Sequence, residues 1–247
     1  MPVPPLKIKQ FGKFMHFSSP LVRGTLIKRY KRFLADVILE TGEAITAHCA
    51  NPGAMTGLNM PGLPVWLSKS DDPKRKLAYS LELVELPTGI VGINTAHPNR
   101  IVAEALAARA IPELAAYDCV RPEVKYAEKS RVDFLLTGQE LPDCYLEIKN
   151  VHLVRAAGLA EFPDSVTLRG ARHLADLARM VGEGHRAAML YLVQRADCTH
   201  FSLAADIDPA YAAAFKSARA AGVEALCYAT VITSERIVLG GPLPIGE

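Results

Sequence analysis

The sequence predicts a chain of mixed α/β class in which a small five-stranded β-barrel precedes an α/β domain. Residues 18–96 hold short apolar runs separated by turns that contain glycine and proline, and helical and strand patterns alternate over residues 97–247. The 247 residues are half hydrophobic and 22% charged, which suffices for two domains with their own cores. Residues 1–17 are basic, contain proline and lack a pattern, so we expect a loose extension there.

The composition argues against a membrane protein and against a disulfide-rich secreted protein. The five cysteines are dispersed and form no C-x-x-C pair, which is typical of reduced thiols. No apolar run approaches the roughly 18 residues of a membrane span, and the amino terminus has no continuous signal core. We expect a cytoplasmic protein without a membrane partner, and a homo-oligomer is compatible with this composition. Because the net charge is only +2, any surface for nucleic acid must be local.

Five short strands account for the first domain. Five strands in about 80 residues fit a small barrel, for which an OB-fold is the natural candidate. Turns at Asn51-Pro52-Gly53, Met60-Pro61-Gly62 and Pro87-Thr88-Gly89 interrupt the apolar runs. The expected β-rich segments are Leu21–Glu40, Ala44–Cys49, Val65–Ser68, Leu77–Leu86 and Ile90–Thr95.

Cations and aromatic residues alternate in one stretch of the barrel, Lys28–Phe33. As a strand it would place Lys28, Tyr30 and Arg32 on one face and Arg29, Lys31 and Phe33 on the other. Such a strand can follow a phosphate backbone and stack bases, so we expect residues 28–32 to bind nucleic acid. The alternative is a solvated edge strand, where lysine discourages aggregation.

The second domain alternates helices and strands after residue 97, which indicates a layered α/β domain with parallel crossovers. Helix Arg169–Glu183 shows core residues at helical spacing, and strand Arg186–Gln194 is almost wholly apolar. The other expected elements are helices Asn99–Ala110 and Asp208–Ala221 and strand Val223–Thr230.

Most of the candidate chemistry lies in Arg121–Asn150, which reads as two or three strands. The runs 132–136 and 145–149 flank a turn at residues 138–140. A hairpin closed at this turn brings Asp133 and Glu147 to within about 5 Å across adjacent strands. Lys149 emerges on the same face as Glu147, roughly 6–7 Å along the strand.

Two carboxylates and a lysine in this arrangement suit Mg²⁺ or Mn²⁺. We expect Asp133 and Glu147 to be metal ligands, with the Ile148 carbonyl as a third, and Lys149 to position or activate a water. Asp143 is a poorer ligand than Asp133 because four strand residues, roughly 13 Å, separate it from Glu147. The alternative is that Glu147 and Lys149 belong to a solvated strand face.

Three helix residues are further candidates. Glu104 can reach in from its helix as another acid, although a solvated helix position is equally compatible with the sequence. Arg169 and His173 lie four residues apart on one helix face, from which they can contact a scissile phosphate. For His173, a packed histidine is the simpler interpretation.

The Asp133…Glu147-x-Lys149 pattern resembles the PD-(D/E)XK nuclease superfamily. From Phe17 onward the chain also resembles the sugar fermentation stimulation protein A (SfsA) family, although Pro52 stands where we expect threonine. The matching segments are Leu26–Val37, Asn51–Met55, Asn94-Thr95, Asn99-Arg100, Glu123–Tyr126, Ser130–Phe134, Pro142–Lys149, Phe162–Thr167, Arg169-Gly170 and His173-Leu174. The resemblance implies an OB-like domain, a PD-(D/E)XK-like domain, DNA binding and a regulatory role in sugar (maltose) metabolism.

Two functions follow as hypotheses. The first is a DNA-binding regulatory protein with weak sequence specificity, because no recognition-helix pattern for base reading is present. The second is an active Mg²⁺-dependent endo- or exonuclease that uses Asp133, Glu147 and Lys149. Clustered acids near phosphates favour a competent centre, since they repel DNA unless a cation lies between them. A small-molecule sugar module has little support, because Trp66 is the single tryptophan.

Overall fold

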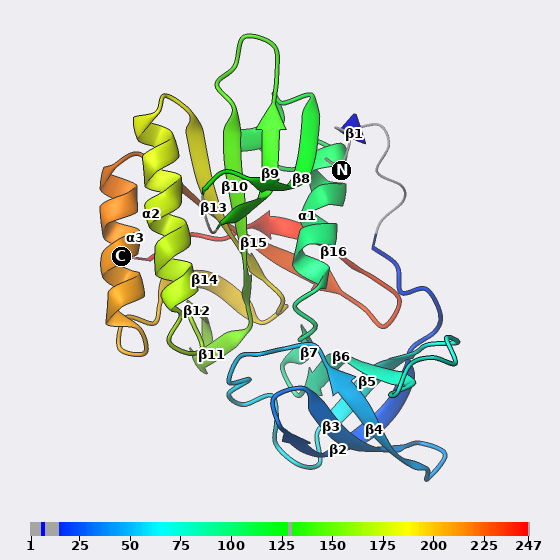
Figure 1. The fold of residues 1–247 in the computed structure, drawn as a ribbon. Helices are drawn as coiled ribbons and strands as arrows, with labels where there is room; N and C mark the ends of the chain where they lie inside the picture. Colours follow the sequence, from blue (N-terminus) through cyan, green and yellow to red (C-terminus); the bar gives the residue numbers. More distant parts are fainter. Residues whose placement is uncertain (1–5, 8–14, 128–129, 247) are drawn as a thin grey trace.

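The computed structural model describes residues 6–7, 15–127 and 130–246, which form an OB-like barrel and an α/β domain (Figure 1). Most of the expected amino-terminal extension, residues 1–5 and 8–14, lies outside the described residues. Of the residues described near the amino terminus, β1 (Leu6–Lys7) pairs antiparallel with β8 (Cys119–Lys125), and Met15 is fully buried in the core beneath α1 (His97–Ala107). The end of that extension therefore packs on the second domain.

The first domain is the predicted five-stranded barrel, with a short sixth strand added at its edge. The sheet order is β4-β3-β2-β5-β6-β7, and a parallel pairing of β4 with β6 closes the barrel. Its core is apolar and includes Leu26, Val37, Leu67 and Leu81. The strands are β2 (Val22–Tyr30), β3 (Leu34–Leu39), β4 (Ala44–Cys49), β5 (Pro64–Lys69), β6 (Tyr79–Leu86) and β7 (Gly89–Gly92).

The basic segment Lys28–Phe33 is not one strand, so its predicted two-faced alternation is wrong. β2 ends at Tyr30, and Lys31 (φ 48°) and Arg32 (φ 62°) adopt the left-handed conformation of a tight turn. The Phe33 N–H donates to the Lys31 carbonyl (2.7 Å) before β3 begins. Turn formation is favoured because it lets β2 and β3 pair as a hairpin, and it places two cations at the tip.

The second domain is a layered α/β structure, as predicted. Its 7-stranded sheet has the order β1-β8-β9-β10-β13-β15-β16, with β10, β13 and β15 parallel. α1 covers one face, and α2 and α3 cover the other (Figure 1). The elements are α1 (His97–Ala107), β8 (Cys119–Lys125), β9 (Arg131–Thr137), β10 (Cys144–Val151), α2 (Leu168–Gly182), β13 (Arg186–Val193), α3 (Pro209–Ala220), β15 (Glu224–Ile232) and β16 (Ile237–Pro242).

Strand alternation explains the two cores. On β10, Leu146 and Ile148 face the core that contains α1, whereas Tyr145 packs toward the core that contains α2 and α3. On the central strand β13, Leu190 and Tyr191 alternate in the same way. Because both faces of β13 are covered by helices, this strand is apolar from Ala187 to Val193.

A small sheet beside the barrel is not predicted by the sequence pattern. β11 (Leu153–Ala156), β12 (Gly158–Phe162) and β14 (Cys198–Leu203) form it in the order β11-β12-β14. The 3-10 turn η2 (Pro112–Leu114) and the edge strand β16 were also not anticipated. Among the described residues, no helix is long and apolar enough to cross a membrane.

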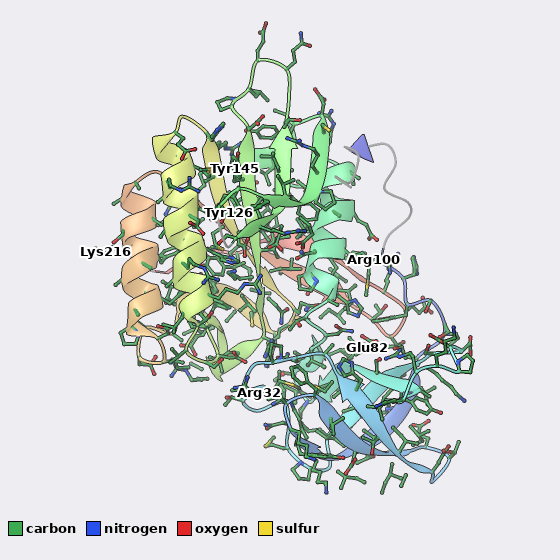
Figure 2. All side chains as sticks on the ribbon, viewed as in Figure 1. Arg32, Glu82, Arg100, Tyr126, Tyr145 and Lys216 are labelled. Atoms are coloured by element: carbon green, nitrogen blue, oxygen red, sulfur yellow. The ribbon has the colours of Figure 1, made fainter. Side chains whose placement is uncertain are left out.

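A buried carboxylate ties the barrel to the start of α1. Glu82 of β6 accepts hydrogen bonds from Ser68 (2.6 Å) and Asn94 (2.7 Å), and it contacts His97 (2.7 Å) in the first turn of α1. Burial raises the pKa of Glu82, but the bonds from His97 and its other donors outweigh burial and lower the pKa overall. Figure 2 shows Glu82 where the two domains meet. The barrel thus fixes where α1 begins.

A second junction uses the loop Asn51–Met55. The Arg29 guanidinium donates to the backbone carbonyls of Asn51 (2.7 Å) and Gly53 (2.9 Å), which holds the loop against the barrel. On the other side of the loop, the Met55 N–H donates to the Asp164 carboxylate (3.3 Å). A side chain at Gly53 would collide with that carboxylate, which explains the glycine. The loop therefore joins the domains.

Candidate functional site

Asp133 of β9 lies where the pairing between β9 and β10 ends. Their antiparallel register ends at Phe134 opposite Leu146, so Asp133 and Glu147 are the next residues of the two strands beyond the last pair. The Asp133 carboxylate then takes the place of a strand carbonyl, because its Oδ2 accepts the Ile148 N–H (2.7 Å). Asn99 of α1 donates to Oδ1 (2.8 Å). Burial and the negative charge of Glu147 raise the pKa of Asp133 to about 6.

Glu147 lies on the β10 face covered by α2 and is only 3% exposed. Its Oε1 accepts from the Lys149 ammonium (2.8 Å) and from His173 Nδ1. Burial alone would raise the pKa of Glu147, but the His173 bond and the Lys149 charge lower it. The other oxygen, Oε2, is buried and has no hydrogen-bond partner among the described residues. The carboxylate is thus ionised, with one oxygen held and one open.

His173 does not face outward as a phosphate contact, because it is 2% exposed and holds Glu147. Arg169 Nε donates to His173 Nε2 (3.2 Å). Arginine is only a donor, so Nε2 must be the acceptor and Nδ1 must carry the proton given to Glu147. His173 is therefore a positioning residue, and Arg169 stays exposed at the start of α2.

The structure brings Asp133, Glu147 and Lys149 together and places Glu104 elsewhere. Glu104 accepts from Arg100 one turn earlier (3.3 Å) and from the Met15 backbone. Burial, partly offset by these donors, raises its pKa. The residue of α1 that reaches Asp133 is Asn99, five positions earlier and on a different face of the helix.

Comparisons with known proteins agree over nearly the whole chain. Residues 27–93 match the family model described as the SfsA N-terminal OB domain, and residues 96–236 match the sugar fermentation stimulation protein RE domain. The chain belongs to the SfsA family. A "Sugar fermentation stimulation protein homolog" from Dinoroseobacter shibae is 61% identical over 94% of this chain and 96% of its own length. Another from Ruegeria sp. is 59% identical over 93% of this chain and 100% of its own.

A solved SfsA structure has the same architecture. The structure of Pyrococcus furiosus SfsA in complex with Ca²⁺ matches with a TM-score of 0.85 at 25% identity, covering 96% of this chain and 100% of the other. The family resemblance and the predicted two-domain fold are thereby confirmed. The two matched family segments meet between residues 93 and 96, in the connection between the end of β7 at Gly92 and the start of α1 at His97.

Within this SfsA fold, the basic residues 28–32 divide into two groups. Lys28 pairs with Asp36 (3.5 Å) and lies over the Tyr30 ring, whose hydroxyl also donates to Asp36 (3.1 Å). Arg29 is committed to loop carbonyls, as described above. Lys31 and Arg32 are exposed at the hairpin tip, and Figure 2 shows Arg32 on the side of the barrel nearest the α/β domain. These last two cations remain accessible to a polyanion.

The acidic pair suits a hard divalent cation. No cluster of three His, Cys, Asp or Glu side chains suited to a metal occurs in the described part of the chain, so the protein offers two carboxylates rather than a full cage. Mg²⁺ commonly takes one or two carboxylates and completes its shell with waters and phosphate oxygens. The open, buried Oε2 of Glu147 is the feature that a cation would satisfy. That the Ile148 carbonyl is a ligand stays a prediction; its N–H bonds Asp133.

Proposed function

We propose that this SfsA-family protein binds DNA and hydrolyses its phosphodiester bonds with Mg²⁺ or Mn²⁺ held by Asp133 and Glu147. The observation that carries the proposal is the open Oε2 of Glu147, a buried oxygen of an ionised carboxylate with no donor in the described part of the chain. Such an oxygen is costly unless a cation neutralises it. Support comes from the related SfsA of P. furiosus, which is described in complex with Ca²⁺, a cation with the same preference for oxygen ligands.

The residues around the acidic pair have distinct roles in this proposal. When bound there, the cation supplies positive charge to a phosphate oxygen and lowers the pKa of a water. Lys149, held 2.8 Å from Glu147, orients that water and stabilises charge on the phosphate. Asn99 and the Ile148 N–H fix Asp133, and His173 fixes Glu147. These contacts hold both carboxylates in place before a cation binds.

DNA binding without cleavage is the second candidate, favoured by the exposed Lys31 and Arg32. In that case the protein would be a DNA-binding regulator with weak sequence specificity. The family resemblance implies that it would regulate sugar (maltose) metabolism. The relatives' names point to sugar fermentation. Both candidate functions use the same fold, so the test must measure DNA cleavage separately from DNA binding.

The test is cleavage of supercoiled, linear duplex and single-stranded DNA with Mg²⁺ or Mn²⁺. We expect metal-dependent cleavage by the wild type and a loss of about 10²–10⁴-fold in Lys149→Ala, because the group that orients the water is gone. Metal binding, measured by calorimetry, is retained in this variant because both carboxylates remain. Lys216→Ala, an exposed change on α3, is the matched control. Absence of cleavage on all three substrates would leave only the DNA-binding candidate.

The accessible cations predict how DNA affinity depends on salt. Changing Lys31 and Arg32 together to glutamine should weaken binding and reduce the slope of log affinity against log salt by about 1–2, because each phosphate contact releases counterions. Arg29→Ala should instead lower the melting temperature, since the loop carbonyls of Asn51 and Gly53 lose their donor. Fluorescence anisotropy across a salt series checks the first change. An unchanged slope in the double variant would remove the hairpin tip from the DNA interface.

A further inference from the structure

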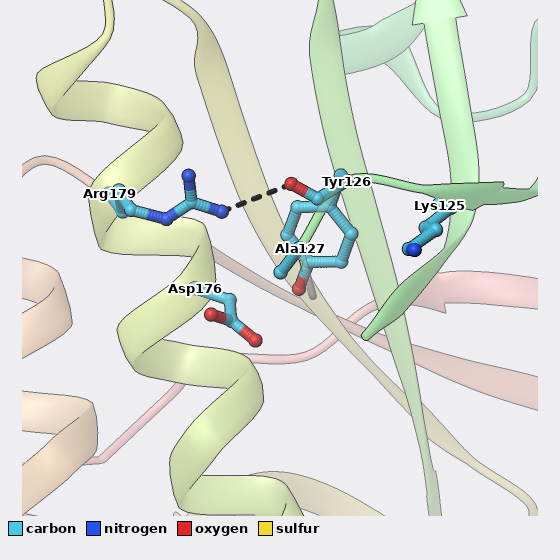
Figure 3. A pocket seen from close by; sticks show the side chains of 5 residues that line it. All are labelled: Lys125, Tyr126, Ala127, Asp176 and Arg179. Carbon is cyan, nitrogen blue, oxygen red and sulfur yellow. Dashed lines mark hydrogen bonds between the residues drawn. The ribbon is translucent and has the colours of Figure 1, made fainter. Parts of the chain in front are cut away.

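A pocket of about 660 Å³ opens between the end of β8 and α2. Figure 3 shows the side chains that line it, with Arg179 and Asp176 of α2 on one side and Tyr126 and Lys125 opposite. Its volume lies in the range of about 300–1,000 Å³ that is typical of small-molecule sites. None of the predicted site residues lines it.

Tyr126 connects this pocket to the acidic pair. Its hydroxyl is buried and has no hydrogen-bond partner among the described residues. Burial and the negative charges of Glu147, Asp176 and Asp133 raise the pKa of Tyr126, so the hydroxyl stays protonated. The ring packs against Tyr145 (centroids 5.4 Å apart), two residues before Glu147 on the same strand face. Buried hydroxyls nearly always have a hydrogen-bond partner, so this one is a candidate to bond a ligand once the side chain turns toward the pocket.

Asp176 supplies the acceptor side of the pocket. Ser130 donates to its Oδ2 (2.5 Å), which fixes the orientation of the carboxylate. Figure 3 shows this carboxylate directed toward Tyr126. Asp176 also lies three residues after His173 on α2, so it is on the helix face that touches Glu147. A carboxylate repels a phosphate but accepts readily from N–H groups.

The rim of the pocket is cationic. Lys125 supplies the exposed charge there, and Arg179, which pairs with Glu183 (2.9 Å), closes the wall by donating to the Tyr126 carbonyl (3.0 Å). The pocket therefore combines a positively charged edge, an aromatic wall, an unpartnered hydroxyl and an oriented carboxylate. This combination suits a nucleotide, with its base inside and its phosphate toward the rim.

We propose that the pocket is a nucleobase subsite, which takes the base of an unpaired nucleotide next to the phosphate held at Asp133 and Glu147. The inference rests on the proposed function and specifies its substrate as DNA with an unpaired nucleotide. Asp176 accepts from the base edge, and the Tyr126 hydroxyl bonds a second polar atom of the base. Guanine is the best match, because its two adjacent N–H donors suit one carboxylate.

The test compares ligands that share one phosphate. Binding of dGMP, dTMP and abasic deoxyribose 5′-phosphate is measured by calorimetry in Ca²⁺ and again without it. We expect dGMP to bind about tenfold tighter than the abasic compound, a preference that Asp176→Asn and Tyr126→Phe each largely remove. Tyr79→Phe and Asp118→Asn are the matched controls, away from the pocket. Equal binding of dGMP and the abasic compound, or full preference in both pocket variants, overturns the subsite.

This design separates the subsite from the hydrolysis itself. A base preference that depends on Tyr126, together with no cleavage by the wild type, would contradict the proposed nuclease activity and support the subsite. Cleavage that is unchanged in Tyr126→Phe and Asp176→Asn, with no base preference, would support the nuclease and remove the subsite. Linear and covalently closed single-stranded oligonucleotides then identify the source of the base. Dependence on Tyr126 for linear DNA alone assigns the pocket to strand ends, and dependence for both assigns it to extruded bases.

Discussion

Glu147→Gln is expected to reduce metal-dependent DNA cleavage by about 10³-fold or more and to leave the fold intact. Glutamine keeps an oxygen to accept from His173 and Lys149, so the buried contacts survive. The open Oε2, however, becomes an amide NH₂, which cannot ligate a cation. A cation contributes several kcal/mol of transition-state stabilisation, and about 1.4 kcal/mol corresponds to tenfold in rate. The loss should therefore appear in kcat and in cation affinity together.

The measurements for Glu147→Gln are single-turnover cleavage and calorimetric Mn²⁺ titration. Glu235→Gln, an exposed change in the turn before β16, controls for the loss of one negative charge. Circular dichroism and melting establish that the variant is folded. Undiminished Mn²⁺ affinity in folded Glu147→Gln would show that the cation site is elsewhere, and cleavage at the wild-type rate would remove Glu147 from the chemistry.

The sequence was sufficient for the central part of the candidate site. Strict alternation on β10 and the turn at residues 138–140 specify a hairpin, and a hairpin fixes which residues oppose each other. The proximity of Asp133 and Glu147 followed from that local geometry. The Lys149–Glu147 contact followed as well, because both side chains lie on one face of a strand.

Contacts between segments far apart in the sequence could not be predicted from local patterns. Arg29 looks like a DNA contact in the sequence, but a loop more than 20 residues later supplies carbonyls that hold it. Residues Asp164 and Met55 meet across 109 positions, and no periodicity encodes such a contact. Tyr126 and Asp176 could have been flagged only as polar residues near buried elements, because the pocket forms by docking α2 on the sheet.

The two domains are coupled through the first turn of α1. His97 of this turn contacts Glu82 of the barrel, and Asn99, two residues later, donates to Asp133. The first turn of α1 thus contacts both the barrel and the acidic pair, and it fixes one relative to the other. The OB-like domain therefore positions the candidate metal ligand, in addition to any contact that its hairpin tip makes with DNA.

The ionised Asp133 carboxylate should lower the folding stability of the metal-free protein. Its pKa rises from 3.8 to about 6 on folding, so the folded state binds the proton more tightly than the unfolded state does. Folding stability therefore falls as pH rises from about 4 through 6, and the full cost is present above pH 6. Asp133→Asn should raise the free energy of unfolding at pH 7.5 by about 1–2 kcal/mol, less than the pKa shift alone implies because one hydrogen bond is compromised.

The same carboxylate must be ionised to hold a cation, so metal binding and stability should respond to Asp133 in opposite directions. Mn²⁺ affinity of the wild type should weaken below about pH 6, and Asp133→Asn should bind Mn²⁺ poorly at every pH. Thermal melts of both proteins from pH 4 to 8, with and without Mn²⁺, check this. The metal-free variant should melt at or below the wild type near pH 4 and above it beyond pH 6, whereas added Mn²⁺ should stabilise only the wild type. A metal-free wild type that gains stability relative to the variant between pH 5 and 7 would show that Asp133 is stabilised, not penalised, by its surroundings.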